Sequence, residues 1–313
     1  MLQLKNVSKS YGKDFRAVND LSFTAEEGAV VGVIGPNGAG KSTTIRMIMD
    51  IIKPDSGTIT LDGKPFTAED KDKIGYLPEE RGLYKKEKVC DVLRYLAALK
   101  GVSKADADAR IDKWLARFDL SEWKDKKIES LSKGMAQKIQ FISTVLHDPK
   151  IVFLDEPFSG LDPVSSDELL AVIKELKQEG RIILFSTHVM EVAERICDHI
   201  IMLNHGQKIL DGNLAQIRKE YGNNSVTVEC EGDGSFLKDI AGVKSVQESG
   251  SEYTLTLQND VNEKDLFAAI AVKAKENNCT VSRYMVNEPS LHAVFVSIAG
   301  KESLSEDAQG EEK

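Results

Sequence analysis

The chain has 313 residues, which suits one large domain plus a smaller one. Its apolar fraction of 41% and charged fraction of 29% are those of an ordinary globular protein, and they exclude a disordered or fibrous chain. The net charge is −9, so the protein as a whole lacks the basic character of a nucleic-acid-binding protein. Most of the negative charge lies in residues 222–313, which hold 8 basic and 16 acidic residues.

The sequence shows neither a secretory signal nor a membrane-spanning segment. Residues 1–5 contain no apolar stretch of the kind that a signal peptide needs. The longest apolar runs, such as residues 29–34, are far shorter than the ~20 residues of a spanning helix. The four cysteines lack metal-ligand spacing, so we expect reduced thiols in a cytosolic protein; they are Cys90, Cys197, Cys230 and Cys279.

Strand and helix patterns alternate through the first 220 residues. Leu2 and Leu4 alternate with polar residues, as do Leu21 and Phe23, and this spacing is typical of half-buried strands. An apolar run at 30–34 leads into a glycine-rich turn and a helical pattern over 42–52. A helix-rich block at about 88–148 precedes further strands at 151–154, 181–186 and 200–204, with helices at 165–178 and 189–196 between them. This order predicts an α/β fold with a mostly parallel, helix-covered sheet.

A turn-rich segment at residues 221–225 is the best candidate domain boundary. Beyond it, strand patterns near 226–230, 253–257 and 281–286 and a helical pattern at 265–277 predict a small α+β domain over residues 222–300. Asn287 is expected to cap a short final helix. We expect the acidic end, residues 301–313, to be disordered.

A glycine-rich run fits a phosphate-binding loop. Residues 35–43, GPNGAGKST, match G-x-x-x-x-G-K-[ST] between a predicted strand and a predicted helix, as that pattern requires. Glycines let backbone N–H groups converge on phosphate oxygens, and the helix start adds partial positive charge. We expect Lys41 to bind the β- and γ-phosphates and Ser42 to bind Mg²⁺. The candidate nucleotide-binding residues are Gly35, Asn37, Gly38, Gly40, Lys41, Ser42 and Thr43.

Two carboxylates follow the apolar strand pattern at 151–154. Asp155, at the C-terminal end of a parallel strand, reaches the crevice where ligands bind and is placed to hold Mg²⁺ through water. Glu156 is placed to activate the attacking water as a general base. Two acids after a strand are usually a solvated turn or a helix cap, but the glycine loop upstream favours the catalytic interpretation.

With the glycine loop and the two acids in this order, the first 220 residues resemble the ATP-binding cassette (ABC) ATPases. The resemblance implies a P-loop NTPase cassette with a helical subdomain at about 88–148, and it implies that Tyr11, in the run VSKSYG, stacks on adenine. His188 looks like the switch histidine that contacts the γ-phosphate. A small-molecule P-loop kinase would share only the glycine loop.

The run LSKGM at residues 131–135 is similar to the ABC signature. The resemblance implies that Ser132 and Gly134 face the ATP of a second subunit, and that residues 159–162 form the D-loop at the dimer interface. The partner subunit is therefore expected to be a second copy or a related ATPase.

Three positions depart from the pattern of the family. Glu79 stands where a Gln is usual, and it is still expected to bind Mg²⁺. Lys133 replaces a signature glycine, and Met135 replaces the signature Gln. Because Asp155 and Glu156 are intact, we expect ATP hydrolysis.

The resemblance implies the ATPase subunit of an ABC transporter, driving a separate membrane permease from the cytoplasmic face of the plasma membrane. The segment after Glu79 and the helical block are the parts expected to contact that permease. The alternative is a soluble ABC ATPase acting on ribosomes, on DNA or in assembly. Its ribosomal members usually carry two cassettes and its DNA-repair members long coiled coils, and this chain has neither. The acidic balance also argues against a nucleic-acid partner.

The acidic C-terminal domain resembles the extension found on ATPases of ABC-2-type export systems, among them sodium-efflux systems. This resemblance covers residues 222–300 and implies export. The simpler interpretation is a packing or dimerising module that binds no ligand.

Overall fold

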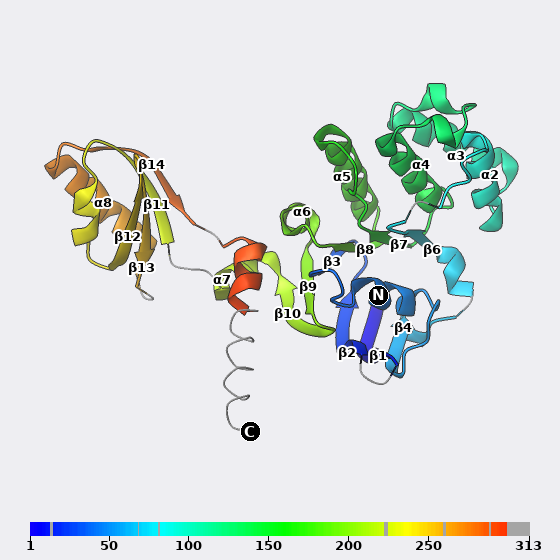
Figure 1. Cartoon of the computed structure of the whole chain (residues 1–313), viewed down its shortest axis with the longest axis horizontal. Helices are drawn as coiled ribbons and strands as arrows, with labels where there is room; N and C mark the ends of the chain where they lie inside the picture. The colour runs from blue at the N-terminus through cyan, green and yellow to red at the C-terminus, as the bar shows by residue number, and fades with distance from the viewer. Residues whose placement is uncertain are drawn as a thin grey trace. The chain divides into compact units, whose positions relative to one another are not determined.

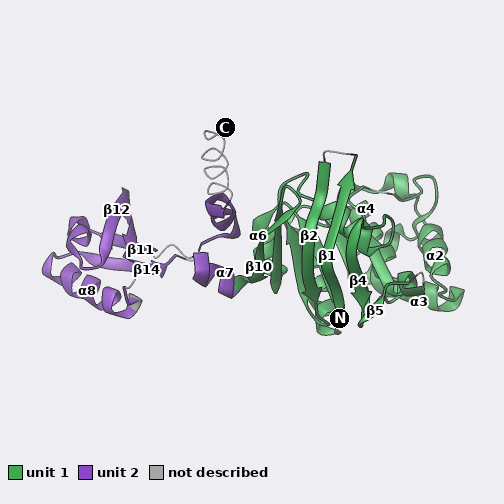
Figure 2. Cartoon of the chain, turned by 90° about the horizontal axis from the view of Figure 1, so that it is seen from below, with its two compact units in different colours: residues 1–214 green, residues 215–313 purple. Residues whose placement is uncertain are grey.

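The computed structural model describes residues 1–12, 15–67, 69–80, 82–221, 225–258, 261–287 and 289–298. Its contacts divide the chain into two compact units, Met1–Leu214 and Ala215–Lys313 (Figure 2). The division lies slightly before the turn-rich segment at 221–225, because helix α7 (Leu214–Tyr221) falls almost entirely in the second unit. The segment 301–313, predicted to be disordered, lies outside the described residues.

The first unit is organised by a six-stranded sheet with the order β10-β9-β3-β8-β7-β6 (Figure 1). Five strands run parallel, and β10 is antiparallel to β9. The strands are β3 (Val30–Ile34), β6 (Ile74–Leu77), β7 (Ile151–Asp155), β8 (Ile182–Thr187), β9 (His199–Asn204) and β10 (Gln207–Asn213). Strands β3, β7 and β8 are buried at every position, which explains their continuous apolar sequences. The predicted α/β fold with a mostly parallel sheet is confirmed.

A second, antiparallel sheet has the order β2-β1-β4-β5. Its strands are β1 (Leu2–Tyr11), β2 (Phe15–Ala25), β4 (Ser56–Leu61) and β5 (Lys64–Pro65). One apolar core joins the strands of both sheets to α1 (Lys41–Ile48), which contributes Ile45 and Ile48. Helix α1 is shorter than the predicted span of 42–52, because Asp50 takes a left-handed φ of 55° and Ile51 is exposed. Helices α5 (Pro163–Gln178) and α6 (Met190–Ile196) complete the alternation of strand and helix.

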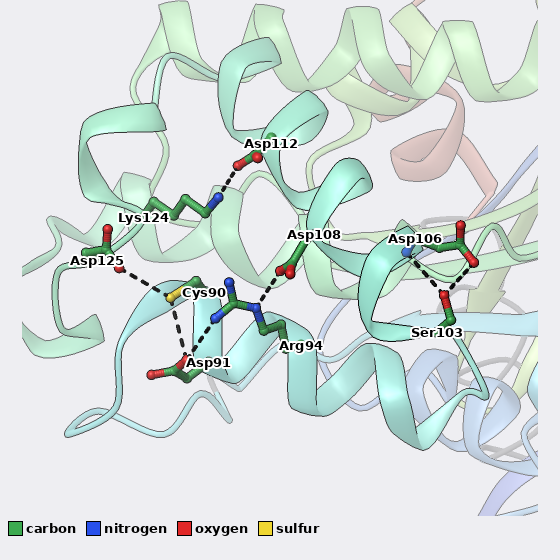
Figure 3. Close-up of polar contacts among 9 residues, drawn as sticks. All are labelled: Cys90, Asp91, Arg94, Ser103, Asp106, Asp108, Asp112, Lys124 and Asp125. Carbon is green, nitrogen blue, oxygen red and sulfur yellow. Dashed lines mark hydrogen bonds and ion pairs between the residues drawn. The ribbon is translucent and has the colours of Figure 1, made fainter.

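The helical block contains α2 (Val89–Leu99), α3 (Lys104–Arg117) and α4 (Lys133–Val145). Ion pairs join its segments: Arg94 of α2 contacts Asp108 of α3, and Lys124 contacts Asp112 (Figure 3). These side chains are partly exposed, so each pair is worth only about 0–1 kcal/mol. The larger contribution comes from a packed aromatic cluster formed by Trp114, Phe118 and Phe141.

The second unit has a four-stranded antiparallel sheet with the order β12-β13-β11-β14. Its elements are β11 (Ser225–Glu231), β12 (Val243–Ser249), β13 (Glu252–Leu257), α8 (Glu263–Glu276) and β14 (Thr280–Val286). Residues of the sheet and α8 share an apolar core that is separate from the core of the first unit. The predicted small α+β fold is therefore present. Strand β12 escapes sequence analysis because none of its residues is fully buried, which leaves no clear apolar alternation.

The final helix, residues 291–298, begins differently from the prediction. Ser290, not Asn287, is its cap, because the Ser290 hydroxyl accepts a hydrogen bond from the Ala293 N–H at 3.1 Å. The Asn287 side chain instead accepts from the Thr227 hydroxyl at 3.0 Å beside the sheet. Within the described ranges, no helix is long and apolar enough to cross a membrane.

The four cysteines are buried and carry free thiols. Burial raises the pKa of Cys197, and it raises the pKa of Cys230 to about 12. A thiol is reactive only as its thiolate, so these two side chains pack as small apolar groups at neutral pH.

Candidate active site

A cavity of about 320 Å³ lies where β6 and β7 end and α1 begins. The carboxyl ends of parallel strands are the usual ligand-binding edge of an α/β sheet. The cavity brings together six of the predicted nucleotide-binding residues and all of the predicted metal ligands. Its lining residues are Phe15, Ala17, Asn37, Gly38, Gly40, Lys41, Ser42, Thr43, Glu79, Asp155 and Glu156.

The glycine loop passes so close to neighbouring backbone that side chains cannot fit at two positions. A Cβ on Gly35 would lie 2.1 Å from the Leu203 carbonyl oxygen, and one on Gly40 would lie 2.4 Å from the Ala17 carbonyl oxygen. Both residues also have a positive φ, 146° and 105°, which strains any other residue. The loop therefore turns tightly and delivers the start of α1, with its free N–H groups, to the cavity.

Lys41 is the first residue of α1 and is only 7% exposed. Its Nζ donates to the carbonyl oxygens of Gly35 at 2.8 Å and Pro36 at 3.0 Å, so the ammonium lies folded against the loop. Burial lowers the pKa of Lys41, and the negative charges of nearby carboxylates, Glu156 first, oppose that shift. The ammonium is thus held where anionic oxygens can replace the two carbonyls.

Asp155 ends β7 and is 3% exposed. Its carboxylate accepts a hydrogen bond from the Ser186 hydroxyl of β8, and the Ser42 hydroxyl at the start of α1 lies near enough to lower its pKa. Burial raises the pKa of Asp155, and the charge of Glu156 adds to that shift, while the two hydroxyls oppose it. Asp155 and Ser42 therefore present adjacent oxygens on one side of the cavity.

Glu156 is held in one orientation by the segment that follows β8. Its two carboxylate oxygens accept from the Thr187 hydroxyl at 3.0 Å and from the backbone N–H of His188 at 2.9 Å. Glu156 has a left-handed φ of 47°, which costs about 1–2 kcal/mol in a residue with a Cβ. The two neighbouring carboxylates have different partners, because Asp155 accepts from Ser186 whereas Glu156 accepts from Thr187 and His188.

His188 lies beside Glu156 rather than in the cavity lining. Its Nδ1 is 2.6 Å from Glu156 Oε1, and its side chain is 54% exposed while that of Glu156 is 11% exposed. His188 is therefore joined to Glu156 through its backbone and its ring, and the imidazole faces solvent more than the carboxylate does.

The chemistry of the cavity fits a nucleotide–Mg²⁺ complex. Three carboxylates, Glu79, Asp155 and Glu156, surround a single lysine, so the strand-end side carries an excess of negative charge that a cation would offset. In the part of the chain that the structure describes, no three His, Cys, Asp or Glu side chains converge closely enough to hold a metal ion. Mg²⁺ commonly takes one or two carboxylates and completes its shell with phosphate and water oxygens.

The aromatic residue that lines the cavity is Phe15, and Tyr11 does not line it. The two residues are paired across the antiparallel strands β1 and β2, and both are exposed. Sequence analysis missed Phe15 because it reaches the cavity only where β2 packs on the glycine loop, with the Ala17 carbonyl against Gly40. It also missed Ser186 and Thr187, which end a buried strand and gave no signal except their position before His188.

Ser132 and Gly134 lie outside this cavity. Ser132 caps α4, where its hydroxyl accepts from the Met135 N–H at 3.2 Å. This contact uses the backbone of Met135, so the change from the usual Gln does not disturb the cap. Both Ser132 and Lys133 line a separate, exposed depression with Leu83 and Lys85.

Comparisons with known proteins agree with this geometry. The family model described as ABC transporter matches residues 18–159, and the model described as ATP-binding protein DrrA1-3-like, C-terminal domain, matches residues 212–299. The uncharacterized ABC transporter ATP-binding protein YhaQ of Bacillus subtilis is 41% identical, over 96% of this chain and 99% of that protein. The linearmycin resistance ATP-binding protein LnrL of Bacillus subtilis is 31% identical, over 96% and 99%.

Among solved structures, an ATP-binding subunit of an ABC transporter superposes with a TM-score of 0.66 and is 35% identical, over 71% of this chain and 93% of that chain. The family resemblance carried by the sequence motifs is confirmed, and the transporter interpretation is favoured over a soluble ABC ATPase. The chain belongs to the ATP-binding, ATP-hydrolysing subunits of ABC transporters.

Proposed function

We propose that this subunit hydrolyses Mg-ATP in the cavity at the strand ends and thereby drives a separate membrane permease that exports its substrate. The observation that carries the proposal is the meeting of the glycine loop, Lys41 and three carboxylates in one cavity. A phosphate-binding half and an acidic half face each other there. Phosphoryl transfer uses a lysine and a metal ion to offset the charge of the phosphates, and carboxylates to hold that metal ion.

Lys41 would exchange its bonds to the Gly35 and Pro36 carbonyls for bonds to the β- and γ-phosphates. Ser42 and Asp155 would hold Mg²⁺, with Glu79 binding it directly or through water. Mg²⁺ supplies charge neutralisation at the phosphate oxygens when it is bound. The buried position of Lys41 strengthens its attraction to phosphate, because little water screens it there.

Glu156 would accept a proton from the water that attacks the γ-phosphate. The bonds from Thr187 and the His188 N–H fix its carboxylate, so little reorganisation is needed when the water arrives. His188 would turn from Glu156 to the γ-phosphate when the nucleotide binds.

A second copy of this chain, or a related subunit, would complete each ATP site. Ser132 lies at an exposed helix start but not at the phosphate cavity of its own chain. Its hydroxyl and the free N–H groups of α4 suit a phosphate presented by a partner. The head-to-tail arrangement uses Ser132 and Gly134 of each copy on the ATP of the other.

The permease would dock on α2 of the helical block. Tyr84 and Tyr95 form an edge-to-face pair with ring centroids 5.9 Å apart, and both side chains are about half exposed. With Glu87, Asp91 and Val92 they line an open groove. An aromatic groove with an acidic rim suits a short helix that carries apolar and basic residues. Such docking would place the subunit at the cytoplasmic face of the plasma membrane. The similarity to LnrL, a linearmycin resistance ATP-binding protein, supports export.

The role of Glu156 is tested against that of Lys41. Glu156→Gln keeps the shape of the side chain but cannot accept a proton, so kcat should fall by about 10²–10⁴-fold while ATP affinity holds. Lys41→Ala should weaken ATP binding itself, because the ammonium meets the phosphates before the transition state. Nucleotide titration and steady-state hydrolysis on both variants give the two quantities. Unchanged hydrolysis in Glu156→Gln would place the base elsewhere.

The two exposed aromatic residues near the cavity are compared by Phe15→Ala and Tyr11→Ala. Removing the ring that stacks on adenine should weaken ATP binding by about 10-fold or more, since stacking on a base is worth about 1–3 kcal/mol. It should leave the affinity for inorganic triphosphate unchanged. Equal ATP affinity in both variants and the unmutated protein would show that neither ring contacts the base.

Assembly is tested in the Glu156→Gln variant, which retains bound ATP. We expect sedimentation to show a dimer with Mg-ATP and a monomer with ADP, and Ser132→Ala should shift the variant toward monomer. A Glu156→Gln protein that stays monomeric with saturating Mg-ATP, even beside its permease, would contradict the head-to-tail arrangement.

Docking is tested by isolating the tagged subunit from detergent-solubilised membranes. We expect a multi-spanning membrane protein to co-purify, and Tyr95→Ala combined with Tyr84→Ala to reduce its recovery by at least about tenfold, as expected for interface anchors. Val164→Ala, at an exposed apolar residue of α5, is the matched control. Recovery that is equal in all three proteins would place the docking surface elsewhere, and recovery of ribosomes or nucleic acid alone would favour the soluble alternative.

A further inference from the structure

Helix α4 covers the free edge of the six-stranded sheet with polar side chains. Strand β6 is an edge strand, so its outer backbone groups lack a partner strand. The single proton of the Thr144 hydroxyl is shared between the Gln140 carbonyl at 3.0 Å and the Tyr76 carbonyl at 3.3 Å, and His147 Nε2 lies 3.0 Å from the Ile74 carbonyl oxygen. Burial lowers the pKa of His147, which favours the neutral imidazole. Thr144 near the C-terminal end of α4 and His147 just after it thus contact alternate carbonyl oxygens of β6.

Gln140 of α4 makes similar contacts with the backbone beyond the end of β6. Its Nε2 donates to the carbonyl oxygens of Pro78 at 3.4 Å and Glu80 at 3.3 Å. These are the residues on either side of Glu79, whose side chain lines the phosphate cavity. The amide of Gln140 therefore holds the short segment from which Glu79 projects.

The Gln140 amide is only partly satisfied. Gln140 is 4% exposed, and its buried Oε1 has no hydrogen-bond partner among the residues that the structure describes. A buried acceptor without a donor destabilises the fold, and an apolar side chain of similar volume would avoid that penalty. The two hydrogen bonds from the amide to the segment around Glu79 offset this penalty. They point to a role for Gln140 in placing that segment.

One turn of α4 reaches the segments that follow both strand ends. Gln137 Nε2 donates to the Pro157 carbonyl at 3.0 Å, directly after Glu156, while Gln140 holds the residues around Glu79. Gln137 is buried as well. Because Gln137 and Gln140 both project from α4, a shift of this helix would be transmitted to the segments that carry Glu156 and Glu79.

We propose that Gln140 is a positioning residue that holds Glu79 at the phosphate cavity and so links helix α4 to Mg²⁺-dependent nucleotide binding. The proposal rests on the role of Glu79 in binding Mg²⁺. Thr144 and His147 contact β6 itself, whereas Gln140 contacts the segment beyond it. Gln140 should therefore affect the nucleotide site, and Thr144 should affect only the stability of the sheet edge.

The test is a double-mutant cycle on the full chain, with Gln140→Met, Glu79→Ala and both together. Met fills a similar volume but cannot donate a hydrogen bond. Equilibrium titration with a non-hydrolysable ATP analogue is carried out in Mg²⁺ and in EDTA. We expect each single variant to weaken binding in Mg²⁺ by about fivefold or more, and the double variant to be no weaker than Glu79→Ala alone. Affinity in EDTA should stay unchanged in all three, which also shows that they are folded.

Thr144→Val is the matched control on the same helix. It should lower the melting temperature without changing the ratio of the affinities in Mg²⁺ and EDTA. If Gln140→Met behaves like Thr144→Val, or if its effect adds fully to that of Glu79→Ala, Gln140 only covers the sheet edge and the inference is wrong. If Glu79→Ala itself leaves binding in Mg²⁺ unchanged, the proposed role of Glu79 fails and this inference fails with it.

Discussion

The buried charge of Lys41 is the constraint on which the phosphate cavity depends. An ammonium that is 7% exposed needs anionic or carbonyl oxygens around it, and the structure supplies both: the loop carbonyls of Gly35 and Pro36, and the carboxylates at the strand ends. The carboxylates outnumber the lysine, so the cavity has separate basic and acidic sides. In the proposed function, the phosphates of the nucleotide would lie toward the loop and its divalent cation toward Asp155.

Strand order explains why these groups meet. Strand β8 lies between β3, which leads into the glycine loop, and β7, which ends in Asp155. Ser186 and Thr187, the last residues of β8, therefore contact Asp155 and Glu156 at the end of β7. Strand β6 lies on the other side of β7 and brings Glu79 to the same edge. The position of Glu79 is less constrained than that of Asp155, because it follows an edge strand and depends on contacts from α4.

The helical block and the second unit are each stabilised in a different way. Aromatic packing between α3 and α4 holds the block together. Its exposed ion pairs add little to stability, so these charged residues can serve recognition instead. The second unit has its own core, formed by Val228, Leu255, Ile270 and their neighbours, and it shares none of the residues that line the phosphate cavity. The described residues that line the phosphate cavity all belong to the first unit.

The sequence by itself determined the elements in which function is encoded locally. The glycine loop between strand and helix and the two acids after an apolar run each depend on neighbours within a few residues, so their spacing is enough to predict them. Only the tertiary structure decided the contributions of Phe15, Thr187 and Gln140. Phe15 reaches the cavity because its strand packs on the glycine loop at Ala17, and Gln140 contacts a segment 60 residues earlier in the chain. No local period marks such residues, because contacts between distant segments exist only after the strands and α4 have packed together.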